Sequence, residues 1–258
     1  MTSRALFRRE GDHVLPLPMA EGPWMPGALS GSAVGPLIAA LLEGVPLTAP
    51  MTFARLSIEF LRPVPMAPLE PVLSVVREGR KQQVLRLELR AEGKEVIHAT
   101  AVRLRLDGVP AASPPAPAFQ PPSGLRFDPR VGGDNGFMEL LDSRVLRTND
   151  FGPGTSEAWL RYRGVVLEGV AVTPFVRAAM FADFGNGLAP IVDPAHFMYM
   201  NADITLHLAR APRGEWMHLQ ARTVDGGAGV AMVGVELADA DGHVGWAHQS
   251  LLLERRPG

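Results

Sequence analysis

The chain has 258 residues and a net charge of −2, a length that allows one large domain or two modest ones. The near-neutral charge gives no electrostatic footprint for nucleic acid, and the absence of cysteine excludes disulfides, thiolate metal sites and a cysteine nucleophile. No segment approaches the ~20 apolar residues of a transmembrane helix, and the charged N-terminal stretch lacks the apolar run of a signal peptide. We therefore expect a cytoplasmic protein with no membrane or nucleic-acid partner.

The first third of the chain predicts one strand, one helix and then four more strands. Alternating side chains favour a strand within 5–17. The apolar stretch Ala28–Glu43 predicts a helix that Gly44 stops, and Pro36 inside it requires a kink or a later start. Alternating runs separated by turn residues then predict an antiparallel meander. Its strands begin with FARLSIEF and continue over Val72–Val76, Gln83–Leu89 and Val96–Leu104.

A proline-rich segment divides the chain into two halves. The stretch VPAASPPAPAFQPP occupies Val109–Pro122. Proline removes ladder hydrogen bonds and favours extended geometry, which is typical of a connector. The same composition would also fit a long surface loop inside one domain. We predict an N-terminal unit over 1–108, a linker over 109–122 and a C-terminal unit over 123–258.

The second half repeats the order of the first. Thr155–Arg163 favours a strand, and the next helix has Thr173 as its N-cap, Pro174 at its first position and Gly185 as its stop. Four alternating strands follow, beginning with ADITLHL and continuing over Met217–Thr223, Val230–Leu237 and Val244–Leu253.

The punctuation of the two meanders indicates an internal duplication. The first strand of each ends in an arginine followed closely by a proline, at Arg62-Pro63 and at Arg210-Ala211-Pro212. The remaining strands and turns keep nearly constant offsets, although two β-rich segments could also match by chance. The order predicts an α+β fold in which each antiparallel sheet wraps around a helix.

A carboxylate interrupts the strand ADITLHL. Ile204, Leu206 and Leu208 share its apolar face, while Asp203 lies on the other face. Aspartate is rare in strands, so its presence here needs an explanation. The usual explanation is that the carboxylate lies on a solvent-exposed face of the strand.

The doubled order and several motifs resemble the acyl-CoA thioesterase II family within the thioesterase-like superfamily. The strongest matches are NADITLHLARAPRGEW, ARTVDGGAG and ADGHVGWAHQSLLLER, and ARLSIEFLRPVP followed by REGRK supports the first half. The resemblance implies a double hotdog, meaning two fused units that each wrap an antiparallel sheet around a central helix. It also implies that the chain hydrolyses an acyl-CoA substrate to free acid and CoA, and that it forms a homo-oligomer.

The resemblance also assigns catalytic residues. The family's water-activating aspartate, threonine and glutamine fall on Asp203, Thr223 and Gln249. Within the duplication Arg55 lies opposite Asp203 and Thr100 opposite Gln249, so the first half lacks this polar set. One active site per chain follows.

These residue types suit thioester hydrolysis. A carboxylate can accept a proton from the attacking water, or it can attack directly to give an anhydride. Hydroxyl and amide groups can hold the water, and a helix N-terminus can stabilise the oxyanion, with the turns before Ala28 and before Phe175 as candidates. Two features depart from the family. The stretch WMPGALSGS replaces its Gly-Gly-Gln run, and Ile204 replaces its frequent histidine.

Two other functions remain open. A hotdog enoyl-CoA hydratase would need an Asp–His dyad, but His207 lies four residues from Asp203, about 13 Å away along a strand. His196 and His248 could approach only through the fold. An acyl-CoA-binding or scaffold protein without turnover is the other alternative.

Searches for other chemistry are negative. The histidines lack the i, i+4 spacing of a helical zinc motif, and no Gly-x-Ser-x-Gly elbow or phosphate-binding loop occurs. We expect no metal and no cofactor besides the CoA thioester itself. Apolar helix residues are expected to form core for the most part, whereas Ala195–Asn201 leads into the Asp203 strand and is expected to line the acyl pocket. The helix residues concerned are Leu37, Ile38, Phe175, Met180 and Phe184.

Overall fold

A computed structural model describes residues 4–108, 118, 136–152 and 154–256. The predicted linker, 109–122, lies outside this part of the chain except for Ala118. Among the helices that are described, none is long and apolar enough to cross a membrane.

The first helix starts later than the predicted Ala28, but Pro36 still lies inside it. α1 runs from Gly31 to Glu43, and the hydroxyl of its N-cap, Ser30, accepts a hydrogen bond from the backbone N–H of Ser32. The strand expected within 5–17 is instead a hairpin, β1 (Ala5–Glu10) and β2 (His13–Pro16), because Gly11 reverses the chain at a φ of 59°. A 3-10 helix, η1 (Pro18–Ala20), follows. The predicted meander forms β3 (Met51–Phe60), β4 (Leu69–Glu78), β5 (Gln82–Ala91) and β6 (Lys94–Arg105).

The second helix begins as predicted and ends earlier. α3 runs from Pro174 to Phe181, and the Thr173 hydroxyl accepts from the N–H of Val176. The expectation that Gly185 stops this helix is wrong, because Gly185 begins a separate short helix, α4 (Gly185–Leu188). A methyl group on Gly185 would lie 2.4 Å from Val235, so close packing on the sheet explains this glycine.

The strands of the second half include several that the sequence pattern did not predict. The expected strands are β8 (Thr155–Tyr162), β11 (Asp203–Leu208), β12 (Trp216–Asp225), β13 (Val230–Asp239) and β14 (Gly242–Arg255). The additional elements are α2 (Gly136–Glu139), β7 (Leu141–Arg147), β9 (Val165–Leu167) and β10 (Phe197–Asn201).

The two halves share one continuous sheet. Its order is β7-β8-β12-β13-β14-β11-β3-β6-β5-β4-β2-β1-β9, and β10 pairs with β14. The halves meet where β11 runs antiparallel to β3, and β9 of the second half adds parallel to β1 of the first. At the central pairing Asp203 faces Glu59 and His207 faces Arg55. The duplication makes Arg55 the counterpart of Asp203, so β3 and β11 are equivalent strands that pair symmetrically about a local pseudo-two-fold axis.

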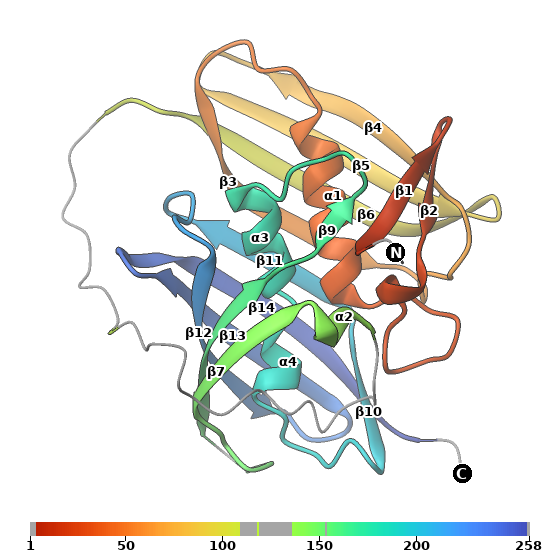
Figure 1. The fold of residues 1–258 in the computed structure, drawn as a ribbon, viewed down its shortest axis with the longest axis vertical. Helices are drawn as coiled ribbons and strands as arrows, with labels where there is room; N and C mark the ends of the chain where they lie inside the picture. The colour runs from red at the N-terminus through yellow and green to blue at the C-terminus, as the bar shows by residue number, and fades with distance from the viewer. Residues whose placement is uncertain (1–3, 109–117, 119–135, 153, 257–258) are drawn as a thin grey trace.

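The helices lie within the curve of this sheet, and α1 and α3 run side by side (Figure 1). A methyl group on Gly35 would lie 2.9 Å from the carbonyl oxygen of Ala179, so the missing side chain permits the close approach. Apolar side chains from both helices and the sheet form one hydrophobic core. The architecture is the double hotdog that the sequence predicts, and it sets the N-terminal end of α1 beside the C-terminal end of α3.

The shared arginines have a structural reason. Arg62 donates to the carbonyl oxygen of Glu95, near the start of β6. Arg210 donates to both carboxylate oxygens of Asp239 at the end of β13 and to the carbonyl of Gly242 at the start of β14. Each arginine therefore links the end of the first strand of its meander to residues beside the last turn of that meander.

Candidate active site

A cavity of about 300 Å³ lies at the junction of the two halves. Its wall is largely apolar, and its apolar side chains include Trp24, Met25, Leu29, Phe60, Leu61, Met200 and Leu252. Asp183 and Arg62 are its charged lining residues, and Asn186 and Asn201 are its amides. Because most of the wall is apolar and the polar groups are few, the cavity has the composition of a small-molecule site.

Asp183 is the buried carboxylate of this cavity. One oxygen, Oδ2, accepts a hydrogen bond of 2.5 Å from the Ser32 hydroxyl at the start of α1, and the other, Oδ1, accepts one of 2.5 Å from the Asn201 amide on β10. The Asn201 Oδ1 in turn accepts from Asn186 of α4 at 3.0 Å. Ser32 belongs to the first half and the other three residues to the second, so this hydrogen-bond network spans the junction.

Burial decides the electrostatics of Asp183. The residue is 7% exposed. Loss of hydration raises the pKa of its carboxyl to about 6, and the hydrogen bonds from Ser32 and Asn201 oppose this shift only in part. A carboxylate with such a pKa is largely ionised at neutral pH and is a stronger base than an exposed aspartate.

Thr223 and Gln249 come from two strands to the segment that carries Asp183. The Gln249 Nε2 donates to the carbonyl of Ala182 at 2.8 Å, and the Thr223 hydroxyl donates to the carbonyl of Ala189 at 2.5 Å. Both side chains are buried, on the sheet face that the helices cover. They hold the two ends of segment 182–189, which contains Asp183.

The structure does not bring Asp203 to these two side chains. Asp203 alternates with the buried Ile204, so its side chain is on the opposite face of β11. Its carboxylate accepts a hydrogen bond of 2.7 Å from the backbone N–H of the exposed Ser250. The catalytic roles of Asp203, Thr223 and Gln249 stay predictions. Asp203 lies on the opposite face of the sheet from Thr223 and Gln249.

The expectations about the pocket are confirmed in part. Met200 and Asn201, at the end of 195–201, line the cavity as predicted. The five apolar helix residues Leu37, Ile38, Phe175, Met180 and Phe184 are buried members of the hydrophobic core.

Sequence reasoning missed the hydrogen-bond network of Asp183, Ser32, Asn186 and Asn201. A usable signal was present in AMFADFGNGLAP, where a charged residue follows a wholly apolar helix end. Such a carboxylate needs either solvent or partners. No local pattern names its partner, because Ser32 precedes Asp183 by 151 residues.

Histidine is missing from the described residues that line the cavity. His248, like Ser250, is exposed, and His207 is exposed on β11. The geometry therefore offers no Asp–His dyad at this cavity for hydration of an enoyl-CoA.

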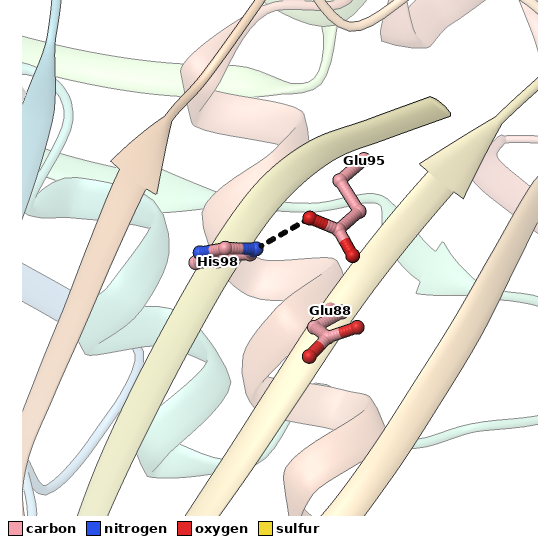
Figure 2. A group of neighbouring side chains, drawn as sticks. All are labelled: Glu88, Glu95 and His98. Atoms are coloured by element: carbon pink, nitrogen blue, oxygen red, sulfur yellow. Dashed lines mark hydrogen bonds and ion pairs between the residues drawn. The ribbon is translucent and has the colours of Figure 1, made fainter. Parts of the chain in front are cut away.

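A separate group of potential metal ligands lies on β5 and β6 (Figure 2). Glu88, Glu95 and His98 place one ligand atom each within 4.8 Å of one another. The Arg90 guanidinium contacts Glu88 at 3.0 Å and Glu95 at 3.4 Å, and His98 contacts Glu95 at 3.2 Å. The carboxylates already face a cationic side chain, and none of the four residues lines the cavity.

Comparison with known families agrees with the doubled architecture. The model of the acyl-CoA thioesterase N-terminal domain matches residues 20–104, and that of the acyl-CoA thioesterase C-terminal domain matches residues 107–253. The chain belongs to the acyl-CoA thioesterase family. It is therefore a thioester hydrolase by family. No curated protein sequence matches it.

Solved structures share the fold over nearly the whole chain. A proposed thioesterase from Novosphingobium aromaticivorans is 23% identical, with a TM-score of 0.75, and the match covers 96% of this chain and 98% of that one. A hotdog-fold protein of unknown function from Alicyclobacillus acidocaldarius is 17% identical, with a TM-score of 0.74 and coverage of 98% and 96%. An acyl-CoA thioesterase II from Mycobacterium marinum is 18% identical, with a TM-score of 0.70 and coverage of 98% and 97%. At these identities the likeness is one of fold.

Proposed function

We propose that the chain hydrolyses an acyl-CoA thioester to a free acid and CoA at the cavity between its two halves, by aspartate-assisted attack of water. The observation that carries the proposal is an apolar cavity with a buried carboxylate and two amides in its wall. The apolar wall suits an acyl chain, and the polar groups suit the reacting carbonyl and the water. Family membership supplies the reaction class.

Two aspartates at the junction are available to assist the water. The family resemblance assigns this role to Asp203, whose carboxylate bonds the backbone of Ser250 on the outer side of the sheet. Asp183 belongs to the wall of the cavity. Either carboxylate could accept a proton from water in chemical terms, so substitution of each has to decide between them.

The N-terminus of α1 supports an oxyanion site. Gly31 is the first residue of this helix and lines the cavity. The first N–H groups of a helix have no partner within the helix, and the helix dipole favours negative charge beside them. At the other candidate, before Phe175, none of the described residues 173–176 lines the cavity. We place the developing oxyanion near Gly31.

The test is release of free thiol from acyl-CoAs. The panel runs from acetyl-CoA to palmitoyl-CoA and includes benzoyl-CoA and phenylacetyl-CoA. Hydration of crotonyl-CoA is measured in parallel and is monitored by the loss of its conjugated double bond. We expect thiol release from at least one thioester and no hydration. Hydration without thiol release would overturn the proposal, as would binding of every acyl-CoA without turnover.

A variant ties the activity to the cavity. Ala28 lines the cavity, so Ala28→Phe should fill it and raise KM or abolish turnover. Ala209→Phe is the matched control, because Ala209 is exposed and does not line the cavity. Equal activity in the two variants would place the reaction elsewhere.

A further inference from the structure

We propose that the cavity accepts acyl groups of up to about eight carbons and that the indole of Trp24 sets this limit; the inference rests on the thioesterase activity proposed above. It names a substrate class, short and medium-length acyl groups, and one residue that determines specificity. The indole lines the cavity, and the ring of the core residue Tyr199 lies behind it.

The volume of the cavity is the first argument. The cavity measures about 300 Å³. An apolar cavity of about 150 Å³ is filled by one benzene, so this one holds about twelve carbon atoms. The thioester group and the adjoining carbons of the pantetheine arm take several of these places, which leaves space for about eight carbons of the acyl group. A palmitoyl chain is about twice as long as that space allows.

The exposure of the wall gives the direction of the substrate. Met25, Leu61 and Arg62 are exposed lining residues, so the cavity opens to solvent beside them. The nucleotide of CoA is too large for the cavity and has to stay outside this opening. The acyl group therefore lies against the less exposed part of the wall, to which the half-buried Trp24 and Leu29 belong.

Tyr199 makes the indole a barrier. The ring centroids of Trp24 and Tyr199 are 4.3 Å apart, and Tyr199 is 2% exposed and does not line the cavity. An acyl chain that passed the indole would have to push it into the core. Removal of the indole would instead extend the cavity to Tyr199, whose buried hydroxyl has no hydrogen-bond partner among the described residues. Hydration of this hydroxyl would offset part of the packing that such a variant loses.

The loop that carries Trp24 is held by its backbone, so the indole keeps its place when a substrate enters. The Gly22 N–H donates to the carbonyl of Ala28 at 2.8 Å, which closes the loop around Trp24. The Met66 N–H donates to the carbonyl of Gly27 at 2.8 Å, which ties the loop to the segment before β4. The wall is therefore a fixed one and limits the length of the acyl group.

Chain-length profiles of kcat/KM test the limit. The substrates are butyryl-, octanoyl-, lauroyl- and palmitoyl-CoA, each below its critical micelle concentration. For the wild type we expect kcat/KM to fall by about tenfold or more from octanoyl-CoA to palmitoyl-CoA. Trp24→Ala should raise the ratio of kcat/KM for palmitoyl-CoA to that for octanoyl-CoA by about tenfold, and Trp24→Phe should raise it by less. Leu29→Trp narrows the cavity and should shift the profile toward butyryl-CoA.

Trp246→Ala is the matched control. Trp246 is 50% exposed on β14 and does not line the cavity, so its removal should leave the wild-type profile unchanged. A wild type with equal kcat/KM for palmitoyl-CoA and octanoyl-CoA would overturn the inference alone. Unchanged profiles in the folded Trp24 and Leu29 variants would do the same. The Leu29 variant decides the matter if neither Trp24 variant folds.

Binding of S-alkyl-CoA thioethers separates this inference from the proposed function, because a thioether is not hydrolysed. Calorimetry should show that the wild type binds S-octyl-CoA more tightly than S-hexadecyl-CoA and that Trp24→Ala removes this difference. The same pattern in a wild type that hydrolyses no thioester would overturn the proposed function and support the limit set by Trp24. Equal binding of the two thioethers by the wild type would overturn the limit, whether or not the protein hydrolyses thioesters.

Discussion

A methyl group on Gly31 would lie 2.3 Å from Oδ1 of Asp183 and 2.8 Å from its carboxyl carbon. Contacts this short do not occur, so either the carboxylate or the start of α1 would have to move. The glycine that begins α1 therefore makes room for the carboxylate that arrives from the other half of the chain. This contact couples the two halves at the cavity.

Gly31→Ala is expected to lower kcat by at least tenfold, because Asp183 would be displaced from Ser32 and Asn201. The measurement is kcat and KM together with the melting temperature. Gly44→Ala at the other end of α1 is the control, since its added methyl would meet only the Leu41 carbonyl at 3.2 Å. Normal turnover in a folded Gly31→Ala protein would show that the position of the carboxylate does not matter.

If Asp183 is the aspartate that assists the water, the pH dependence of the reaction follows from its raised pKa. A base must be deprotonated to act, and burial raises the pKa of this carboxyl to about 6. The rate at saturating substrate is therefore expected to fall as the pH drops through about 6, approaching tenfold per pH unit well below it. The measurement is kcat between pH 4.5 and 8 in buffers of constant ionic strength. An acid limb centred near pH 4, the range of an exposed carboxyl, would contradict the assignment.

The same burial predicts that Asp183 lowers stability at neutral pH. Its pKa is about 6 in the folded chain against about 3.8 for an aspartate in water, so the folded state binds more protons between these values. The free energy of unfolding then falls as the pH rises from about 4 to about 6, and this loss persists above pH 6. The difference in pKa corresponds to about 3 kcal/mol at most.

Asp183→Asn should therefore raise the melting temperature at pH 8 and change it little at pH 4. An asparagine can still accept from Asn201 and donate to the Ser32 hydroxyl, so the hydrogen bonds can be replaced. Asp142→Asn should do the opposite at pH 8, because Asp142 is paired with Arg161 and Arg163. Thermal unfolding of the three proteins at both pH values is the measurement. A variant at Asp183 that is less stable than the wild type at pH 8 would mean that the carboxylate stabilises the fold.

Local patterns in the sequence were sufficient to predict the strands of both meanders and the start of α3. Alternation marks the meander strands, and Thr173 with Pro174 marks the start of α3, because a cap and a proline act within a single turn. The hairpin at Gly11 and the break after Phe181 were not predicted. The first depends on one glycine in the left-handed region, and the second accompanies the packing of Gly185 on Val235.

The site was predictable only in part, because its contacts are remote in sequence. The resemblance pointed to Thr223 and Gln249, which lie behind segment 182–189. The pairing of Asp183 with Ser32 depends on the packing of α3 against α1. No periodicity encodes that packing. The side chain of Asp203, in contrast, follows the alternation of its own strand and so lies on the outer face.

Isotope labelling detects direct attack by Asp183 when water then hydrolyses the anhydride at the carboxyl carbon of the aspartate. In that case the first molecule of acid keeps an oxygen from the enzyme, and the oxygen of water enters Asp183. If the carboxylate acts as a base, the oxygen added to the acid comes from water. Both carboxylate oxygens are held by donors, Ser32 and Asn201, which favours proton transfer over attack. We therefore expect a single turnover in H₂¹⁸O, with enzyme in excess over acyl-CoA, to give an acid that carries one ¹⁸O. Mass spectrometry of the acid and of the peptide containing Asp183 is the measurement. Unlabelled acid together with ¹⁸O in that peptide would establish the covalent route instead.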